Sequence, residues 1–397
     1  MDAEAKRKKR LALFEDSMQR VYGPYDPTTT DPEHWQPPTD PGAGGHRGRY
    51  LWTDAFGVVN FVTLAREKGP GPSRAHYLGL AERLASTVHE VLGRERDADP
   101  SSPSYPVPAR LPGATDEEPL AGGLRIGKAV ASGPDGDGQY HHYLTLWMFA
   151  LSRLALATGR ARWNALAAQL ARAALPRFFF ATTRPSHSSS SPAGESLVWK
   201  MAPDLRSVLV HSKGHLDDLD GLVVCRALQA VARRLGSDDD AEALEPLVAR
   251  YRRMVDREPP RAPSGDPLDL GMGLWICHLD RDAPWSRRLA AQGLRLARAR
   301  FLAACAAPLT EASRRRRLAF REFGACLGIK CYGAEEESLV AGVEEVLAVW
   351  EGKLTAAEGA GDDEDLRPIN LVMYAAALIP GAFRDGYVPF PEPKMNE

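Results

Sequence analysis

The feature that most constrains this chain is a repeated alternation between two kinds of helical segment. Six segments are apolar on nearly every side, and six others carry one polar face. A helix that is apolar all round has to be buried on both sides, whereas an amphipathic helix covers a core with one stripe. The alternation therefore predicts an all-α fold in which an inner set of helices is covered by an outer set.

The two sets follow from the spacing of apolar residues along the chain. The inner set comprises residues 50–67, 139–158, 215–235, 267–279, 318–330 and 368–378. The outer set comprises residues 3–22, 73–92, 160–178, 240–255, 284–303 and 335–350. Six such pairs predict a closed toroid, an (α/α)6 barrel that forms a single domain over residues 1–397. An open helical solenoid is the alternative architecture.

The connections between these segments predict where a ligand binds. Those that follow outer segments are long, and residues 94–138 and 181–214 form two of them. In a closed toroid they gather at one mouth, together with the first turns of the inner helices, whose unpaired N–H groups favour anionic or hydroxyl-rich ligands. We therefore expect both loops to lie over a cleft. Residues 196–211 also contain two β-prone runs around Pro203 and predict a small hairpin there.

The charge balance and the cysteine content limit the binding partners and the cellular compartment that we expect. The 50 basic and 52 acidic side chains give a formal net charge of −2, so no overall field attracts nucleic acid or an anionic membrane. No apolar run reaches the roughly 20 residues that cross a bilayer, and the amino terminus lacks the apolar stretch of a secretory signal. Five scattered cysteines without a CxxC pair favour reduced thiols. We expect a cytoplasmic monomer or homodimer.

Three carboxylates gather at the start of the third inner segment, at Asp217, Asp218 and Asp220, directly after His215. One of them, Asp217, stands where a helix N-cap belongs. A second carboxyl buried beside it would have its pKa raised by repulsion and burial. A carboxyl that stays protonated near neutral pH can act as a general acid. The spacing is not that of an EF-hand, so we expect no metal ion here.

A second cluster precedes the second inner segment, where Tyr140 is followed by His141 and His142. Successive helical residues point about 100° apart, so only one of these histidines is expected to face the cleft. No HExxH spacing accompanies them, and zinc is not predicted. Together with Tyr140, Trp52 and Trp199 are candidate platforms for the apolar face of a sugar ring.

Other candidate ligand contacts share a position at an inner-segment start or on the expected hairpin. They are Asp54, Lys200, His211, Glu322 and Asn370. Two of the polar residues also have a structural interpretation. Glu322 can pair with one of the arginines at 314–317, and His278, late in its segment, is interpreted as a hydrogen-bonded structural residue. Asp137 and Asp266 also stand at expected N-cap positions.

The helix order and two short motifs resemble the six-hairpin glycosidase superfamily. The stretch Leu51-Trp52-Thr53-Asp54-Ala55-Phe56 looks like the start of the first inner helix in unsaturated glucuronyl hydrolases, although Asp54 replaces a small residue. Leu219-Asp220-Gly221-Leu222 is similar to the Leu-Asp-Gly-Leu stretch that carries the catalytic aspartate of the rhamnogalacturonyl relatives. The resemblance implies that Asp220 is the acid/base, and the partner aspartate has no clear counterpart.

The resemblance implies a glycoside hydrolase that acts on a sugar or uronic-acid-containing substrate, small or oligomeric, without a cofactor. Asp220 would donate the proton, and Asp54, Asp218 or His142 would position water. The superfamily also contains N-acylglucosamine 2-epimerases, and a sugar epimerase or isomerase would use His142 and His215 as its proton-transfer pair. A toroid that binds a carbohydrate or a partner without catalysis is the third hypothesis.

Overall fold

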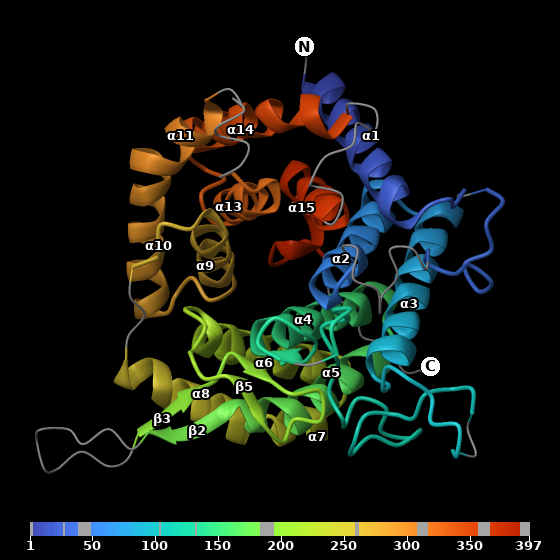
Figure 1. Cartoon of the computed structure of the whole chain (residues 1–397). Helices are drawn as coiled ribbons and strands as arrows, with labels where there is room; N and C mark the ends of the chain where they lie inside the picture. Colours follow the sequence, from blue (N-terminus) through green and yellow to red (C-terminus); the bar gives the residue numbers. More distant parts are fainter. Residues whose placement is uncertain are drawn as a thin grey trace, which may run out of the picture. The chain divides into compact units, whose positions relative to one another are not determined.

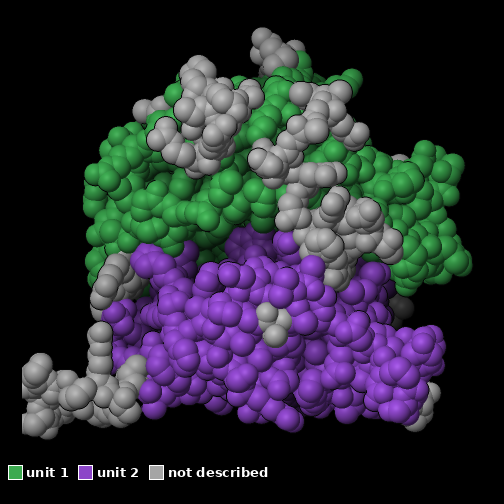
Figure 2. Space-filling model, viewed as in Figure 1, with its two compact units in different colours: residues 1–41, 56–83, 260–389 green, residues 42–55, 84–259, 390–397 purple. Residues whose placement is uncertain are grey.

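A computed structural model describes most of the chain, namely residues 3–26, 28–38, 49–102, 105–131, 133–182, 194–258, 262–307, 317–355 and 366–389. The chain forms two compact units, which Figure 2 shows in green and purple. The first unit comprises residues 1–41, 56–83 and 260–389, and the second comprises residues 42–55, 84–259 and 390–397. The single-domain organisation stays a prediction.

The first unit consists of an inner and an outer row of helices. The inner row contains α2 (Leu51–Glu67, from Phe56 onward), α9 (Pro267–Leu279), α13 (Ala319–Tyr332) and α15 (Arg367–Leu378). The outer row contains α1 (Ala3–Tyr22), α10 (Pro284–Leu296), α11 (Leu302–Ala306) and α14 (Glu337–Thr355). In Figure 1, α13 lies between α9 and α15 and packs against both, while α10 covers α9 and α1 covers α15.

Glycines let the inner helices α9 and α13 approach each other closely. A Cβ atom on Gly271 of α9 would collide with the backbone of Gly324 in α13, and one on Gly328 would collide with Gly271. The two backbones therefore touch where no side chain stands between them. This contact explains why both segments read as apolar all round: each is covered on several sides at once.

The second unit has two inner helices, α4 (His141–Thr158) and α6 (Asp217–Arg234), which pack against each other. Its outer helices are the last part of α3 (Pro72–Leu92), α5 (Ala161–Ala174), α7 (Asp238–Ala243) and α8 (Glu245–Arg257). Two small antiparallel sheets accompany them. One has the order β1 (Gln139–Tyr140), β4 (Lys200–Met201), β5 (Val208–Val210), and the other pairs β2 (Phe179–Thr182) with β3 (Gly194–Leu197).

The helix pattern that the sequence predicts is confirmed, with local differences. The expected outer helix 240–255 is interrupted at Leu244, so that α8 begins with proline in its first turn. The expected helix 284–303 contains a π-helical turn at Ala297–Phe301. The hairpin expected at 196–211 is formed by β4 and β5 alone, because residues 194–197 pair with β2 instead. No helix in the described ranges is both long and apolar enough to span a membrane.

Candidate functional site

Five aromatic side chains from four segments of the second unit form an aromatic cluster. They are Trp52 on α2, Tyr140 on β1, His142 and Tyr143 on α4, and Trp199 between β3 and β4. The rings of Tyr140, His142 and Trp199 are parallel to within 12–17°, with centroids 5.0–5.9 Å apart. Trp52, in the first turn of α2, lies 5.7 Å from His142 at a steep angle. Pairing of β1 with β4 sets Tyr140 opposite Lys200, next to Trp199, and so aligns the parallel rings.

His142 is held as a neutral imidazole within this cluster. The indole Nε1 of Trp199 donates to Nδ1 of His142 at 3.0 Å, and an indole N–H can only donate. The proton of His142 therefore resides on Nε2. Burial lowers the pKa of His142 to about 4, although the carboxylate of Asp217 raises it in part. With its side chain 23% exposed, His142 can donate a hydrogen bond from Nε2 to a ligand oxygen.

Asp217 connects the start of α6 to the two histidines. Its Oδ1 lies 3.6 Å from Nδ1 of His141 and 3.9 Å from Nδ1 of His142, and its Oδ2 accepts from the backbone N–H of Gly214 at 2.8 Å. Burial raises the pKa of Asp217, but the contacts with both histidines and with Gly214 outweigh it, and the pKa is lowered. Asp217 therefore stays ionised. The carboxylate accepts from a residue before the helix and makes no N-cap bond, so the capping prediction is wrong here.

The remaining carboxylates and histidines of the 211–220 stretch differ in exposure. Asp218 is buried and accepts from the Lys213 ammonium at 2.7 Å. Asp220 lies one helical turn after Asp217 and is 9% exposed. His211 and His215 are exposed. The first turn of α6 therefore carries three carboxylates, and the ammonium of Lys213 is paired with one of them, Asp218.

Asp54 and Lys200 are enclosed by other parts of the second unit. The carboxylate of Asp54 pairs with the Arg49 guanidinium at 3.0 and 3.3 Å, and both side chains are 0% exposed. The ammonium of Lys200 donates to the carbonyls of Gly133, Pro134 and Gly136 at 2.5–3.0 Å. Burial lowers the pKa of Lys200 to about 8, and nearby Lys128 adds to this. Lys200 thus holds the backbone of residues 133–136, whereas Asp54 is neutralised by a buried guanidinium.

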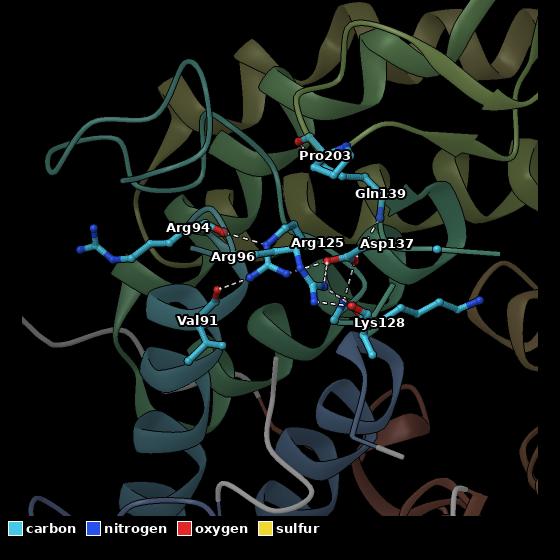
Figure 3. Close-up of polar contacts among 12 residues, drawn as sticks. Val91, Arg94, Arg96, Arg125, Lys128, Asp137, Gln139 and Pro203 are labelled. Carbon is cyan, nitrogen blue, oxygen red and sulfur yellow. Dashed lines mark hydrogen bonds and ion pairs between the residues drawn. The ribbon is translucent and has the colours of Figure 1, made fainter. Parts of the chain in front are cut away.

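A buried ion-pair network, drawn in Figure 3, fixes the described part of the long connection before β1. Oδ2 of Asp137 lies 2.6 Å from Arg125 and 3.3 Å from Arg96, while its Oδ1 accepts from two backbone N–H groups. Gln139 donates to the carbonyls of Gly122 and Pro203. Asp137 therefore organises a loop and caps no helix, contrary to the prediction. Sequence reasoning did not identify Arg125, which only its isolation among apolar residues could have signalled.

The candidates of the first unit have structural partners. Glu322 forms a two-point pair with Arg317 at 2.7 Å and accepts from the Trp350 indole at 2.7 Å. Asn370 accepts from the backbone N–H of Phe320 at 2.9 Å, in the first turn of α13. His278 contacts the carbonyl of Trp275 with Nδ1 and accepts from the Asp385 N–H with Nε2. Glu322 therefore pairs with an arginine of the 314–317 run, and His278 is a hydrogen-bonded structural residue, as the sequence predicted.

The cysteines lie in the interior of the protein. All five cysteines are free thiols, and all are buried. Burial raises the pKa of Cys225 and Cys277 to about 12, so these thiols are not ionised near neutral pH. Within the described ranges, no group of three or more His, Cys, Asp and Glu side chains is placed to hold a metal ion.

Comparison with known proteins identifies the fold. No protein-family model and no curated protein matches the sequence. A family 76 glycoside hydrolase, a mannosidase from Bacteroides thetaiotaomicron VPI-5482, has a similar structure, with a TM-score of 0.53 and 12% identity over 94% of this chain and 98% of that one. A family 76 hydrolase from a bovine Bacteroides thetaiotaomicron strain gives 0.52 and 13%, over 94% and 77%.

A D-mannose isomerase gives a TM-score of 0.47 with 12% identity, over 96% of this chain and 99% of that one. The two family 76 hydrolases have TM-scores above 0.5. They show that the chain has the all-α six-hairpin fold, the (α/α)6 toroid, which confirms the fold class predicted from the alternation of helices.

Proposed function

We propose that this chain is a carbohydrate-active enzyme that cleaves a glycosidic bond, with Asp220 as the proton donor. The observation that carries the proposal is the 3.9 Å distance between Oδ1 of Asp217, in the first turn of α6, and Nδ1 of His142 in the aromatic cluster. Asp217 and Asp220 are three residues apart and share one face of the helix. A sugar ring can stack on the parallel rings while a carboxyl group reaches its glycosidic oxygen.

The three carboxylates divide the work according to their partners. Asp217 is kept ionised by the histidines and binds no proton to give away. Asp218, held at 2.7 Å by Lys213, takes the proton from the attacking water. Asp220 gives its proton to the leaving oxygen as the C–O bond breaks, and the water oxygen bonds to the anomeric carbon. His142 donates from Nε2 to a substrate hydroxyl.

The substrate that we propose is a sugar with or without a carboxylate. The aromatic cluster suits the C–H face of a neutral hexose such as mannose, which the names of the structurally similar proteins include. The exposed side chains of His211 and His215, with Lys213 between them, also suit the carboxylate of a uronic acid.

The sugar-isomerase alternative requires a base at His142. Its low pKa favours a neutral ring, but Nδ1 already accepts from Trp199 and Nε2 carries the proton. To act as a base, His142 would have to give up the indole hydrogen bond or shift its proton. Deuterium from solvent incorporated into a reducing sugar, without any cleavage, would support isomerisation by His142 and His215 over hydrolysis.

The test is a turnover assay on a panel of mannosides and glucuronides with the wild type and Asp220→Asn. Removing the proton donor is expected to lower kcat by roughly 10²–10⁴-fold while sugar binding is retained. Asp239→Asn, on an exposed position of α7, is the matched control and should keep full activity. Undiminished turnover in Asp220→Asn would remove Asp220 from the mechanism. Sugar binding without turnover across the panel would favour a non-catalytic toroid.

A further inference from the structure

Behind the aromatic cluster, three side chains from three helices form a buried relay, which consists of Tyr251, His141 and Asp217. The Tyr251 hydroxyl on α8 lies 2.7 Å from Nε2 of His141 on α4. Nδ1 of His141 in turn faces Oδ1 of Asp217 on α6 at 3.6 Å. All three are buried, so none of them contacts a ligand directly. The relay ends at the carboxylate that also faces His142.

The partners of the two adjacent histidines place their protons on different nitrogens. At 3.6 Å the contact between Nδ1 of His141 and the Asp217 carboxylate is electrostatic and longer than a hydrogen bond. The negative charge favours the neutral form of His141 that carries its proton on Nδ1, and in that form Nε2 accepts from the Tyr251 hydroxyl. His142 is the reverse, because its Nδ1 accepts from Trp199. One oxygen of Asp217 therefore faces an N–H of His141 and a lone pair of His142. A proton on His142 would make the second contact attractive, so the Asp217 carboxylate favours protonation of His142.

We propose that Tyr251 and His141 are positioning residues that hold the charge of Asp217, so that His142 stays neutral and presents its Nε2–H to the ligand. If the Tyr251 hydroxyl were absent, the Nδ1–H form of His141 would lose its partner. Asp217 would then act on His142 without an N–H to offset its charge, and the Nδ1 of His142 would be protonated at higher pH. The imidazolium would in turn repel the indole N–H of Trp199.

A glycine seats the tyrosine ring of the relay. A Cβ atom on Gly221 would overlap the ring of Tyr251, so only glycine at this position leaves room for the phenol next to α6. Gly221 directly follows Asp220, the residue to which the proposed function assigns proton donation. The same turn of α6 therefore contains the proposed acid, Asp220, and the glycine against which the Tyr251 ring packs.

Two charged groups beside the relay have partners of opposite charge, and Asp220 is a further carboxylate three residues after Asp217 on α6. Asp218 is paired with Lys213, and Arg250 beside Tyr251 is paired with Glu195 on β3. The neighbouring thiol and phenols are uncharged at neutral pH, because burial raises the pKa of the Cys225 thiol to about 12 and also raises that of Tyr140 and Tyr143. Phe178 is the aromatic neighbour of His141 and carries no charge.

The experiment follows the ring nitrogens of the full-length protein, labelled with ¹⁵N-histidine, by NMR over a pH titration, with His142→Gln to assign the His142 signals. In the wild type we expect His142 as the neutral Nε2–H form until pH falls to about 4. Tyr251→Phe should raise the His142 midpoint by one pH unit or more, a tenfold gain in proton affinity. Asp217→Asn should lower it.

Tyr374→Phe is the matched control, because Tyr374 is also buried and its hydroxyl has no hydrogen-bond partner among the described residues. It should leave the His142 midpoint unchanged. Gly221→Ala, which displaces the Tyr251 ring, should act in the same direction as Tyr251→Phe. A midpoint that stays within about 0.3 pH unit in both Tyr251→Phe and Asp217→Asn would overturn the relay. The readout needs no turnover, so the proposed glycosidase activity can fail while the relay stands, and the reverse.

Discussion

The helix starts of α13 and α15 in the first unit can be compared with those of α4 and α6 in the second. Both pairs bring a carboxylate or amide to the first turn of an apolar helix. In the first unit, Glu322 is enclosed by Arg317 and Trp350, and Asn370 satisfies a backbone N–H. In the second unit, His142 is partly exposed among aromatic rings, and the carboxylate of Asp217 lies 3.9 Å from its Nδ1.

The difference shows that position on an inner helix does not by itself make a polar residue functional. What decides is whether the surrounding elements supply a complete set of partners. A buried carboxylate with a two-point guanidinium pair and an indole donor has its oxygens occupied. A neutral imidazole with one nitrogen bonded and one N–H at a partly open surface still has a donor to offer a ligand.

The largest effect that we expect is a loss of stability in the first unit when Glu322 is replaced. Glu322→Ala leaves the guanidinium of Arg317 and the indole of Trp350 without their common acceptor. It should lower the free energy of unfolding by about 3–5 kcal/mol, measured by denaturant titration. Sugar binding per folded molecule should not change. The control is Glu336→Ala, which removes an exposed pair with Arg298 and should cost about 1 kcal/mol or less. Equal losses in the two variants would contradict the structural role of Glu322.

A smaller effect concerns acid stability in the second unit. Burial lowers the pKa of His89 to about 3 and that of His142 to about 4, against 6.5 in an unfolded chain. Between those values the unfolded state binds a proton that the folded state does not, so stability falls as pH drops below 6.5. At pH 5 the loss is about 2 kcal/mol for each histidine.

The measurement is the free energy of unfolding at pH 7.5 and pH 5 for the wild type and His89→Asn. The variant should lose about 2 kcal/mol less than the wild type on acidification. His34→Asn, at an exposed position, should behave as the wild type. An acid loss that His89→Asn leaves unchanged would mean that carboxylates, and not the buried histidines, dominate acid unfolding.

The smallest effect tests the aromatic cluster itself. Trp199→Phe keeps a ring but removes the N–H that Nδ1 of His142 accepts. Affinity for a mannose oligosaccharide or a glucuronate disaccharide, measured by calorimetry in the Asp220→Asn background, should fall about tenfold, or about 1.4 kcal/mol. Trp285→Phe, on the buried side of α10 in the first unit, should bind as before. Unchanged affinity in Trp199→Phe would show that the hydrogen bond from Trp199 to His142 does not contribute to ligand binding.

Much of the fold was accessible from the sequence because helix periodicity is local information. The alternating apolar and amphipathic segments predicted the inner and outer helices, and Asp266 was correctly predicted as an N-cap of α9, where it accepts from Leu268 and Asp269. The same reasoning was wrong for Asp137 and Asp217. In both cases the carboxylate binds groups outside the first turn, and a distant or loop partner outweighs the capping geometry.

By itself, the sequence determined the helices, their order and the residue types at each helix start, because these depend on neighbours within a few positions. Only the tertiary structure decided what each polar group does. Tyr251 lies 110 residues from His141, and Trp199 lies 57 residues from His142, yet these contacts set where the protons reside. Proton placement depends on which donors and acceptors meet after folding, and no local pattern records which distant side chain will arrive.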